Sequence, residues 1–148
     1  MEERLITCRV VGVYGHALTR GNKYIIINED EDKYRITGNH GKAIWICKGY
    51  FIEGNIEVPI LVTWKIDDDI NIFDLAEITL TFSNGSKRWC LVTTPERLVK
   101  HFNKEMEPPG MNIRHLIITK TMNHGDIEKT LLYLDSNDEL IEASKPLE

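Results

Sequence analysis

The sequence lacks the patterns that would place it at once in a well-known class of protein. No run of residues approaches the roughly 18 consecutive apolar residues that a membrane-spanning helix needs, so we expect no membrane contact. No phosphate-binding loop, dinucleotide-binding glycine motif or nucleophile-elbow sequence is present. These absences argue against the common nucleotide-binding and hydrolase classes, and we expect a protein that is not an enzyme and uses no cofactor.

Cysteine is also scarce, because the chain has only Cys8, Cys47 and Cys90, which are odd in number and far apart. They form no Cys-x-x-Cys pair and share no metal-ligand spacing with a histidine. We therefore expect buried, reduced thiols and no metal site. The first residues, Met-Glu-Glu-Arg, contain no apolar signal core, which favours a cytoplasmic protein.

What the chain does have is enough apolar sequence for a real core. Its 148 residues are 42% hydrophobic, which allows one domain or two small ones. The net charge of -5 is unevenly distributed. Residues 1–66 have 9 Lys and Arg against 8 Asp and Glu, whereas residues 67–148 have 9 against 15. An acidic surface repels phosphate and favours a basic protein partner, so nucleic acid is not the expected partner.

The first third of the chain has the pattern of β-structure. Period-two alternation and β-branched residues predict strands over residues 5–13, 23–28, 33–37 and 42–47. The unbroken apolar run at residues 24–27 predicts a strand that is buried on both faces, or a strand that another segment covers. Acidic or glycine-containing turns separate these strands, which indicates a small antiparallel barrel.

The rest of the chain predicts strands mixed with helices. The expected strands cover residues 58–66, 77–82, 88–93 and 114–119, with a possible last strand at 139–143. Asn84-Gly85 is a strong hairpin signal between the second and third of these.

Two helices are also predicted in this part of the chain. The first begins at Thr94-Pro95 and ends before Pro108, with Leu98, Val99, Phe102 and Met106 at helical spacing. A second helix follows Asn123–Asp126, with Ile127, Leu131 and Leu134 on one face, and residues 145–148 are expected to fray.

Residues 17–53 carry a set of turn and core positions that resembles a known fold family. The residues that carry the resemblance are Leu18-Thr19-x-Gly21-x-x-Tyr24, the acidic tip 29–32, Tyr34-Arg35-Ile36, Gly38-Asn39-His40-Gly41 and Trp45-Ile46-x-Lys48-x-x-Phe51. This segment is similar to the SH3-like barrels of many short bacterial and phage proteins. The resemblance implies a module that binds peptides, proteins or nucleic acids. The expected fold class is therefore α+β, with an SH3-like β-barrel at residues 1–56 and a β-hairpin, helix, strand and helix unit at residues 57–148.

Two acidic segments are the candidate partner-binding sites. Their residues are Glu29, Asp30, Glu31 and Asp32 in the first, and Asp67, Asp68, Asp69 and Asp74 in the second. Each segment is compatible with a solvated turn, with a docking patch for a basic partner, or with a site for a hard cation. The second segment lacks the glycine and terminal glutamate of an EF-hand, and we predict no metal in either.

Two groups of cations beside tryptophan support an alternative site. Lys42, Trp45 and Lys48 form the first group, and Lys87 and Arg88 beside Trp89 form the second. Cations and exposed aromatic rings together bind single-stranded nucleic acid, although a core tryptophan flanked by solvated cations gives the same pattern. A nucleophilic Cys90 near a histidine is a further alternative and would indicate a hydrolase.

These observations lead to one functional hypothesis and one main alternative. We expect a protein that is not an enzyme and that binds a protein partner to inhibit or neutralise it, as immunity proteins and phage anti-defence proteins do. Its acidic loops would face a basic partner such as a toxin or a defence nuclease. The alternative is a nucleic-acid-associated regulator built on the SH3-like barrel. The sequence does not determine the oligomeric state.

Overall fold

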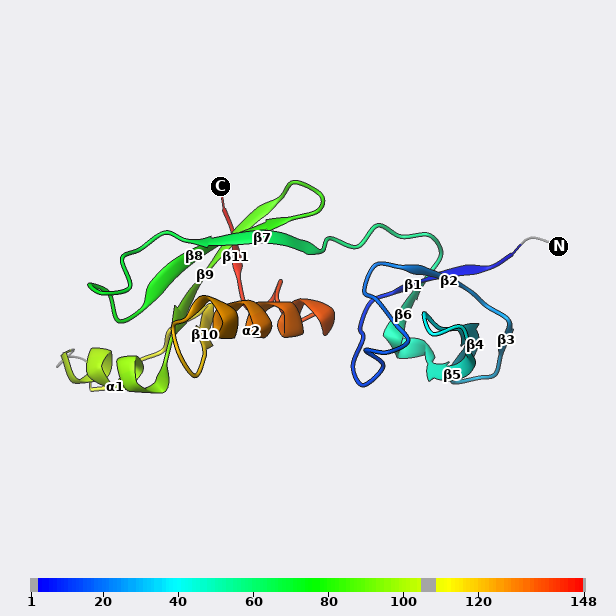
Figure 1. Cartoon of the computed structure of the whole chain (residues 1–148), viewed down its shortest axis with the longest axis horizontal. Helices are drawn as coiled ribbons and strands as arrows, with labels where there is room; N and C mark the ends of the chain where they lie inside the picture. The colour runs from blue at the N-terminus through cyan, green and yellow to red at the C-terminus, as the bar shows by residue number, and fades with distance from the viewer. Residues whose placement is uncertain (1–2, 105–108, 148) are drawn as a thin grey trace. The chain divides into compact units, whose positions relative to one another are not determined.

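A computed structural model describes residues 3–104 and 109–147 and has an α+β fold made mostly of sheets, with two α-helices. The chain divides into two compact units (Figure 1). Unit 1 consists of residues 1–60 and 136–138, and unit 2 consists of residues 61–135 and 139–148. No helix in the described residues is both long enough and apolar enough to cross a bilayer.

Unit 1 contains two three-stranded antiparallel sheets. Their strand orders are β2-β1-β6 and β3-β4-β5. A short 3-10 helix, η1, joins the second sheet to the last strand of the first. The elements are β1 (Leu5–Cys8), β2 (Lys23–Ile25), β3 (Asn28–Glu29), β4 (Lys33–Thr37), β5 (Ala43–Cys47), η1 (Lys48–Tyr50) and β6 (Phe51–Glu53).

One apolar core is shared by the two sheets of unit 1. Strand β4 buries Tyr34 and Ile36 and exposes the residues between them, as its alternating sequence predicts. Aromatic rings meet edge to face in this core, with Phe51 next to both Tyr24 and Tyr34. Among the residues that the structure describes, the pairings give two separate sheets and no closed ring of strands, so the predicted SH3-like barrel is not confirmed.

Three predictions for unit 1 are wrong. The first strand ends at Cys8, because the chain turns at Gly12, whose φ of 53° is left-handed. The run 24–27 is not buried on both faces, since Ile25 is 45% exposed and Ile27 is 54% exposed. Cys47 lies on the exposed face of β5 and not in the core, whereas the other two cysteines are buried as expected.

Unit 2 is built on a sheet with the strand order β10-β9-β8-β7 (Figure 1). Strand β10 runs parallel to β9, while β7, β8 and β9 are antiparallel to their neighbours, and β11 also pairs with β9. The elements are β7 (Leu61–Ile66), β8 (Ala76–Phe82), β9 (Lys87–Thr93), α1 (Pro95–Lys104), β10 (Leu116–Ile118), α2 (His124–Ser136) and β11 (Lys145–Pro146).

The core of unit 2 lies between the sheet and α2. Ile127 and Leu131, four residues apart on one helix face, are completely buried. They pack with the inward residues of the central strands, such as Ile78, Leu80 and Val92. The predicted hairpin at Asn84-Gly85 is present, since β8 and β9 pair antiparallel on either side of it.

Two element predictions for unit 2 need correction. Helix α1 is present where it was predicted but buries none of its residues, and its Val99 and Phe102 are 60% and 40% exposed. Met106 and Pro108, which belong to the same prediction, lie outside the described residues. The expected strand at 139–143 is a turn, and residues 145–146 pair with β9 and do not fray.

Candidate functional site

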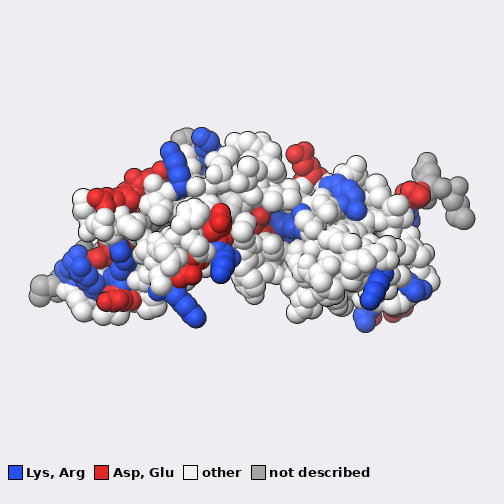
Figure 2. All heavy atoms as spheres, in the orientation of Figure 1, with Lys and Arg blue, Asp and Glu red and all other residues white. Residues whose placement is uncertain are grey.

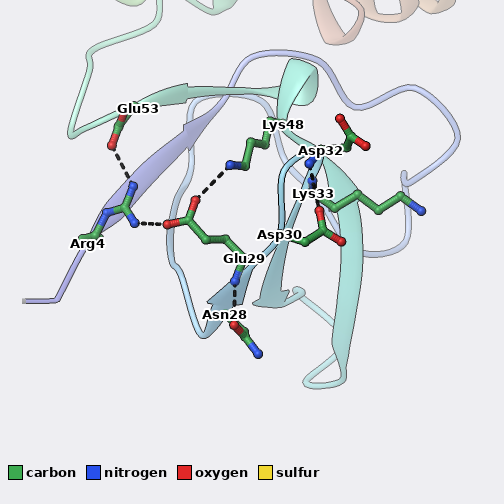
Figure 3. Close-up of polar contacts among 8 residues, drawn as sticks. All are labelled: Arg4, Asn28, Glu29, Asp30, Asp32, Lys33, Lys48 and Glu53. Carbon is green, nitrogen blue, oxygen red and sulfur yellow. Dashed lines mark hydrogen bonds and ion pairs between the residues drawn. The ribbon is translucent and has the colours of Figure 1, made fainter.

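The acidic tip 29–32 of unit 1 is held by its own hydrogen bonds (Figure 3). Glu29 forms ion pairs with Arg4 and with Lys48, whose Nζ lies 3.0 Å from Glu29 Oε2. Asp30 Oδ1 accepts the backbone N–H groups of Asp32 and Lys33 at 2.8 and 2.7 Å. The hairpin tip is therefore an ordered turn that uses two of its four carboxylates internally.

These contacts change the acidities of the tip residues. Hydrogen bonds and charge attraction from Lys48 and Arg4 lower the pKa of Glu29, and two backbone N–H groups lower the pKa of Asp30. Glu31 and Asp32 are exposed and form no ion pair in the described residues. Only these two carboxylates are left for an external partner of the tip.

The second acidic segment is a loop between β7 and β8, here called the 67–75 loop. Each of its first three aspartates accepts a hydrogen bond that shapes the loop. Asp67 Oδ2 accepts from Thr79 Oγ1 at 2.5 Å, and Asp68 Oδ2 accepts from the backbone N–H of Glu77 at 2.8 Å. Asp69 Oδ1 accepts from the backbone N–H of Asn71 at 2.8 Å. The aspartates therefore act as turn residues as well as charges.

The same loop is anchored at its other end to α1 and β9. The guanidinium of Arg97 donates to the carbonyl oxygens of Ile70 and Phe73, and Thr93 Oγ1 donates to the carbonyl oxygen of Asp74 at 2.8 Å. Lys104 Nζ lies 2.8 Å from Asp74 Oδ2, and this contact lowers the pKa of Asp74. The loop is thus tied down at several points along its length.

This anchored loop exposes two large apolar side chains. Ile72 is 68% exposed and Phe73 is 49% exposed. Their backbone N–H groups donate to the carbonyl oxygen of Asp69, so the turn that presents them is fixed. Asp68 and Asp69 form no ion pair in the described residues and leave net negative charge beside this apolar tip.

A cleft of about 460 Å³ opens behind the 67–75 loop in unit 2. Side chains from the loop, from the start of α1 and from the segment after β10 form its walls. They are Ile70, Asn71, Ile72, Phe73, Asp74, Thr94, Glu96, Arg97, Lys100, Lys120, Thr121 and Met122. The lining therefore places three cations, Arg97, Lys100 and Lys120, beside this loop.

The structure places the alternative nucleic-acid residues in both units. In unit 1, Trp45 is 40% exposed on β5 and lies directly across from Arg35 of β4. Lys42 is exposed nearby in sequence, whereas Lys48 is already bound to Glu29 and lies over the Tyr34 ring. The outer face of this sheet thus combines an exposed indole with cations.

The other two residues of this alternative belong to unit 2. Lys87 is exposed at the start of β9. The guanidinium of Arg88 donates hydrogen bonds to Ser144 Oγ and to the carbonyl oxygens of Ile141 and Ser144. These hydrogen bonds hold the C-terminal turn in place. Arg88 therefore has a structural role, and binding of nucleic acid would compete with these hydrogen bonds.

The cysteine and histidine candidates show no catalytic geometry in the described residues. Burial raises the pKa of the Cys90 thiol to about 12, which opposes formation of a thiolate nucleophile. His115 lies edge-on to the Trp89 ring, and His124 stacks on the Trp64 ring at 4.5 Å between centroids. No group of three or more metal-ligating side chains occurs among the residues that the structure describes.

The apolar tip and the cleft were not predicted from the sequence. The available signal is the segment Ile70-Asn71-Ile72-Phe73, where apolar residues lie between aspartates and not in a strand or helix pattern. Of the cations of the cleft, Arg97 and Lys100 lie one helical turn apart on α1, whereas Lys120 is distant in the sequence and joins them only through the fold.

No family model matches the chain, and comparisons with curated proteins and with solved structures also give no match.

Proposed function

We propose that this chain is a protein-binding protein, not an enzyme, that inhibits or neutralises its partner through the 67–75 loop. The observation that carries the proposal is an anchored loop with Ile72 and Phe73 exposed at its tip. Exposed aromatic and aliphatic residues on a rigid support have the properties of an interface anchor, because little entropy is lost when they are buried.

The charge around the tip favours a basic partner. Asp68 and Asp69 flank the apolar residues, and the part of the chain from residue 67 onwards has 9 Lys and Arg against 15 Asp and Glu. Carboxylates at the rim of an interface raise the association rate with a positively charged protein more than they raise the affinity itself. A toxin or a nuclease that attacks nucleic acid has the required positive surface.

A double substitution separates the charge of the loop from its shape. In Asp68→Asn with Asp69→Asn, each amide keeps an oxygen that can accept the hydrogen bond from Glu77 or Asn71.

The full chain is first used as bait in a host lysate, with and without nuclease, to identify the partner. Association rates of the purified pair are then measured by surface plasmon resonance at low and high salt.

We expect the double variant to bind more slowly and with a weaker salt dependence than the natural chain. Glu142→Gln is the matched control, because Glu142 is also an exposed carboxylate of unit 2. An association rate that the aspartate substitutions leave unchanged would argue against the loop as the docking site. If a basic partner binds equally well to the natural chain, the double variant and Glu142→Gln, the contact lies elsewhere on the chain.

Unit 1 supports a second candidate function, that of a nucleic-acid-associated regulator. The specific observation is the exposed Trp45 beside Arg35, with Lys33 and Lys42 also exposed on the same two-stranded region. Base stacking on an indole with nearby cations binds single strands without sequence preference. Trp45→Ala should abolish retention on single-stranded DNA at low salt, and absence of any retention by the natural chain would remove this candidate.

Two finer features of the proposal concern fold and location. We infer that the two sheets of unit 1 are the halves of an SH3-like barrel, because segment 23–29 supplies a strand to each sheet and both share one core. We also infer a cytoplasmic location, since all three cysteines are free thiols, which is the usual state in a reducing compartment.

A further inference from the structure

The cleft behind the 67–75 loop contains cations that the proposed protein contact does not use. Its volume of about 460 Å³ lies inside the range of roughly 300–1,000 Å³ that is usual for small-molecule sites. All of its walls belong to unit 2.

The position of the cleft follows from the sheet topology. Strands β9 and β10 are parallel neighbours, so their carboxyl ends lie at the same edge of the sheet. Thr94 follows β9 and begins the turn into α1, while Lys120 and Thr121 follow β10 on the way to α2. Crevices at the carboxyl ends of parallel strands are common ligand sites, because loops leave the sheet there in different directions.

The charge of the cleft is opposite to that of its surroundings. Lys100 and Lys120 line it and form no ion pair in the described residues, although the charge of Lys100 attracts that of Asp74, and the Arg97 guanidinium donates to two carbonyl oxygens. Of the two carboxylates in the lining, Asp74 is already bound to Lys104, which leaves Glu96. Figure 2 shows several blue side chains, with red ones between them, at the end of unit 2 that carries α1.

The cleft also has apolar walls beside these cations. Phe73 and Ile72 are exposed on one side, and Met122 contributes to another. An aromatic ring and aliphatic groups next to converging cations match a ligand with an anionic group attached to a flat or apolar body. Three cations can compensate two negative charges, which suits a phosphate better than a single carboxylate.

We propose that this cleft binds a small phosphate-bearing molecule of about nucleotide size. Lys100 and Lys120 would contact the phosphate oxygens, and the apolar walls would cover the body of the ligand. The site shares Ile72 and Phe73 with the proposed protein contact, whereas its lysines are not part of the acidic rim.

The test uses the full chain and four probes in isothermal titration calorimetry at low salt. ATP supplies phosphate and a flat base, pyrophosphate supplies the phosphates alone, adenosine supplies the base alone, and citrate supplies carboxylates. The key variant is Lys100→Gln with Lys120→Gln. Lys129→Gln is the matched control, because Lys129 is an exposed lysine of α2 outside the cleft.

We expect ATP to bind more tightly than pyrophosphate, adenosine and citrate. The affinity for ATP should fall at least tenfold in the double variant and stay unchanged in Lys129→Gln. Thermal unfolding of the variants checks that both remain folded.

Several results would overturn the proposal. One is the absence of saturable ATP binding at millimolar concentration. Another is a loss of ATP affinity in Lys129→Gln as large as that in the double variant. A third is citrate binding as tight as that of ATP. Partner binding is measured separately through the aspartate substitutions, so failure of one proposal is distinguishable from failure of the other.

Discussion

Replacement of Ile72 by alanine is the most direct test of the apolar tip. Ile72 is 68% exposed, so about two thirds of its side chain is available to a partner. Complete burial of an isoleucine is worth about 1.5–3 kcal/mol, and two thirds of this is about 1–2 kcal/mol. Ile72→Ala should therefore weaken binding by roughly 5- to 30-fold.

The same arithmetic predicts a small effect on the fold. The buried third of Ile72 corresponds to about 0.5–1 kcal/mol of the free energy of unfolding. Phe73→Ala is a less clean test, because Phe73 is 49% exposed and truncation would remove comparable contacts from the folded chain and from the complex. A loss of binding in that variant could come from a distorted loop.

The assay is a calorimetric titration of the purified partner, with urea unfolding of each variant in parallel. Val62→Ala is the matched control, since Val62 is an apolar residue of unit 2 that is 66% exposed but lies on β7, away from the loop tip. The reasoning is refuted if Ile72→Ala binds as tightly as the natural chain, or if both alanine variants lose the same affinity.

Three further predictions follow from burial and charge. Native alkylation followed by mass spectrometry should label Cys47 alone, because burial raises the pKa of Cys8 to about 11 and that of Cys90 to about 12, and labelling of a buried thiol before denaturation would contradict this. The lowered pKa of Glu29 means that its ionised form stabilises the fold above its unfolded pKa, and this contribution is lost as the pH falls through the folded pKa. Urea unfolding should therefore find Glu29→Gln more destabilising at pH 7 than at pH 3, and an equal effect at both would count against the ion pairs. Ile127→Ala should cost about 2–5 kcal/mol of unfolding free energy by the same method, since Ile127 is completely buried, and a loss under 1 kcal/mol would contradict its core position.

The sequence predicted best the elements whose signal is local. Alternation in β4 and in β8, the Asn84-Gly85 turn and the Thr94-Pro95 helix start all act over a few residues, and all appear in the structure. The exposure of Ile25 was predicted wrongly because a run of isoleucines does not reveal which side is covered. Burial depends on the partner strand, which no local pattern specifies.

The cleft could not be predicted because its residues are joined only by topology. Lys100 lies on α1 and Lys120 follows β10, and the parallel pairing of β10 with β9 brings their segments to one edge. Helix α1 shows the opposite case, because its apolar spacing predicts burial at Val99 while the structure leaves that residue exposed. Periodicity indicates a helix, but it does not show that another element covers the helix.

The two acidic segments differ in how charge is connected to structure, and this difference decides which is the better docking site. In the tip 29–32, Arg4 and Lys48 compensate the charge of Glu29, so a partner could reach Glu31 and Asp32 but would compete with existing ion pairs at Glu29. In the 67–75 loop, Asp68 and Asp69 accept hydrogen bonds from neutral N–H groups, which leave their negative charge uncompensated. A basic partner can therefore approach the loop without breaking a contact that holds it, and the apolar tip lies at the same place. The loop is for this reason the segment where steering by charge and burial of apolar surface can act together.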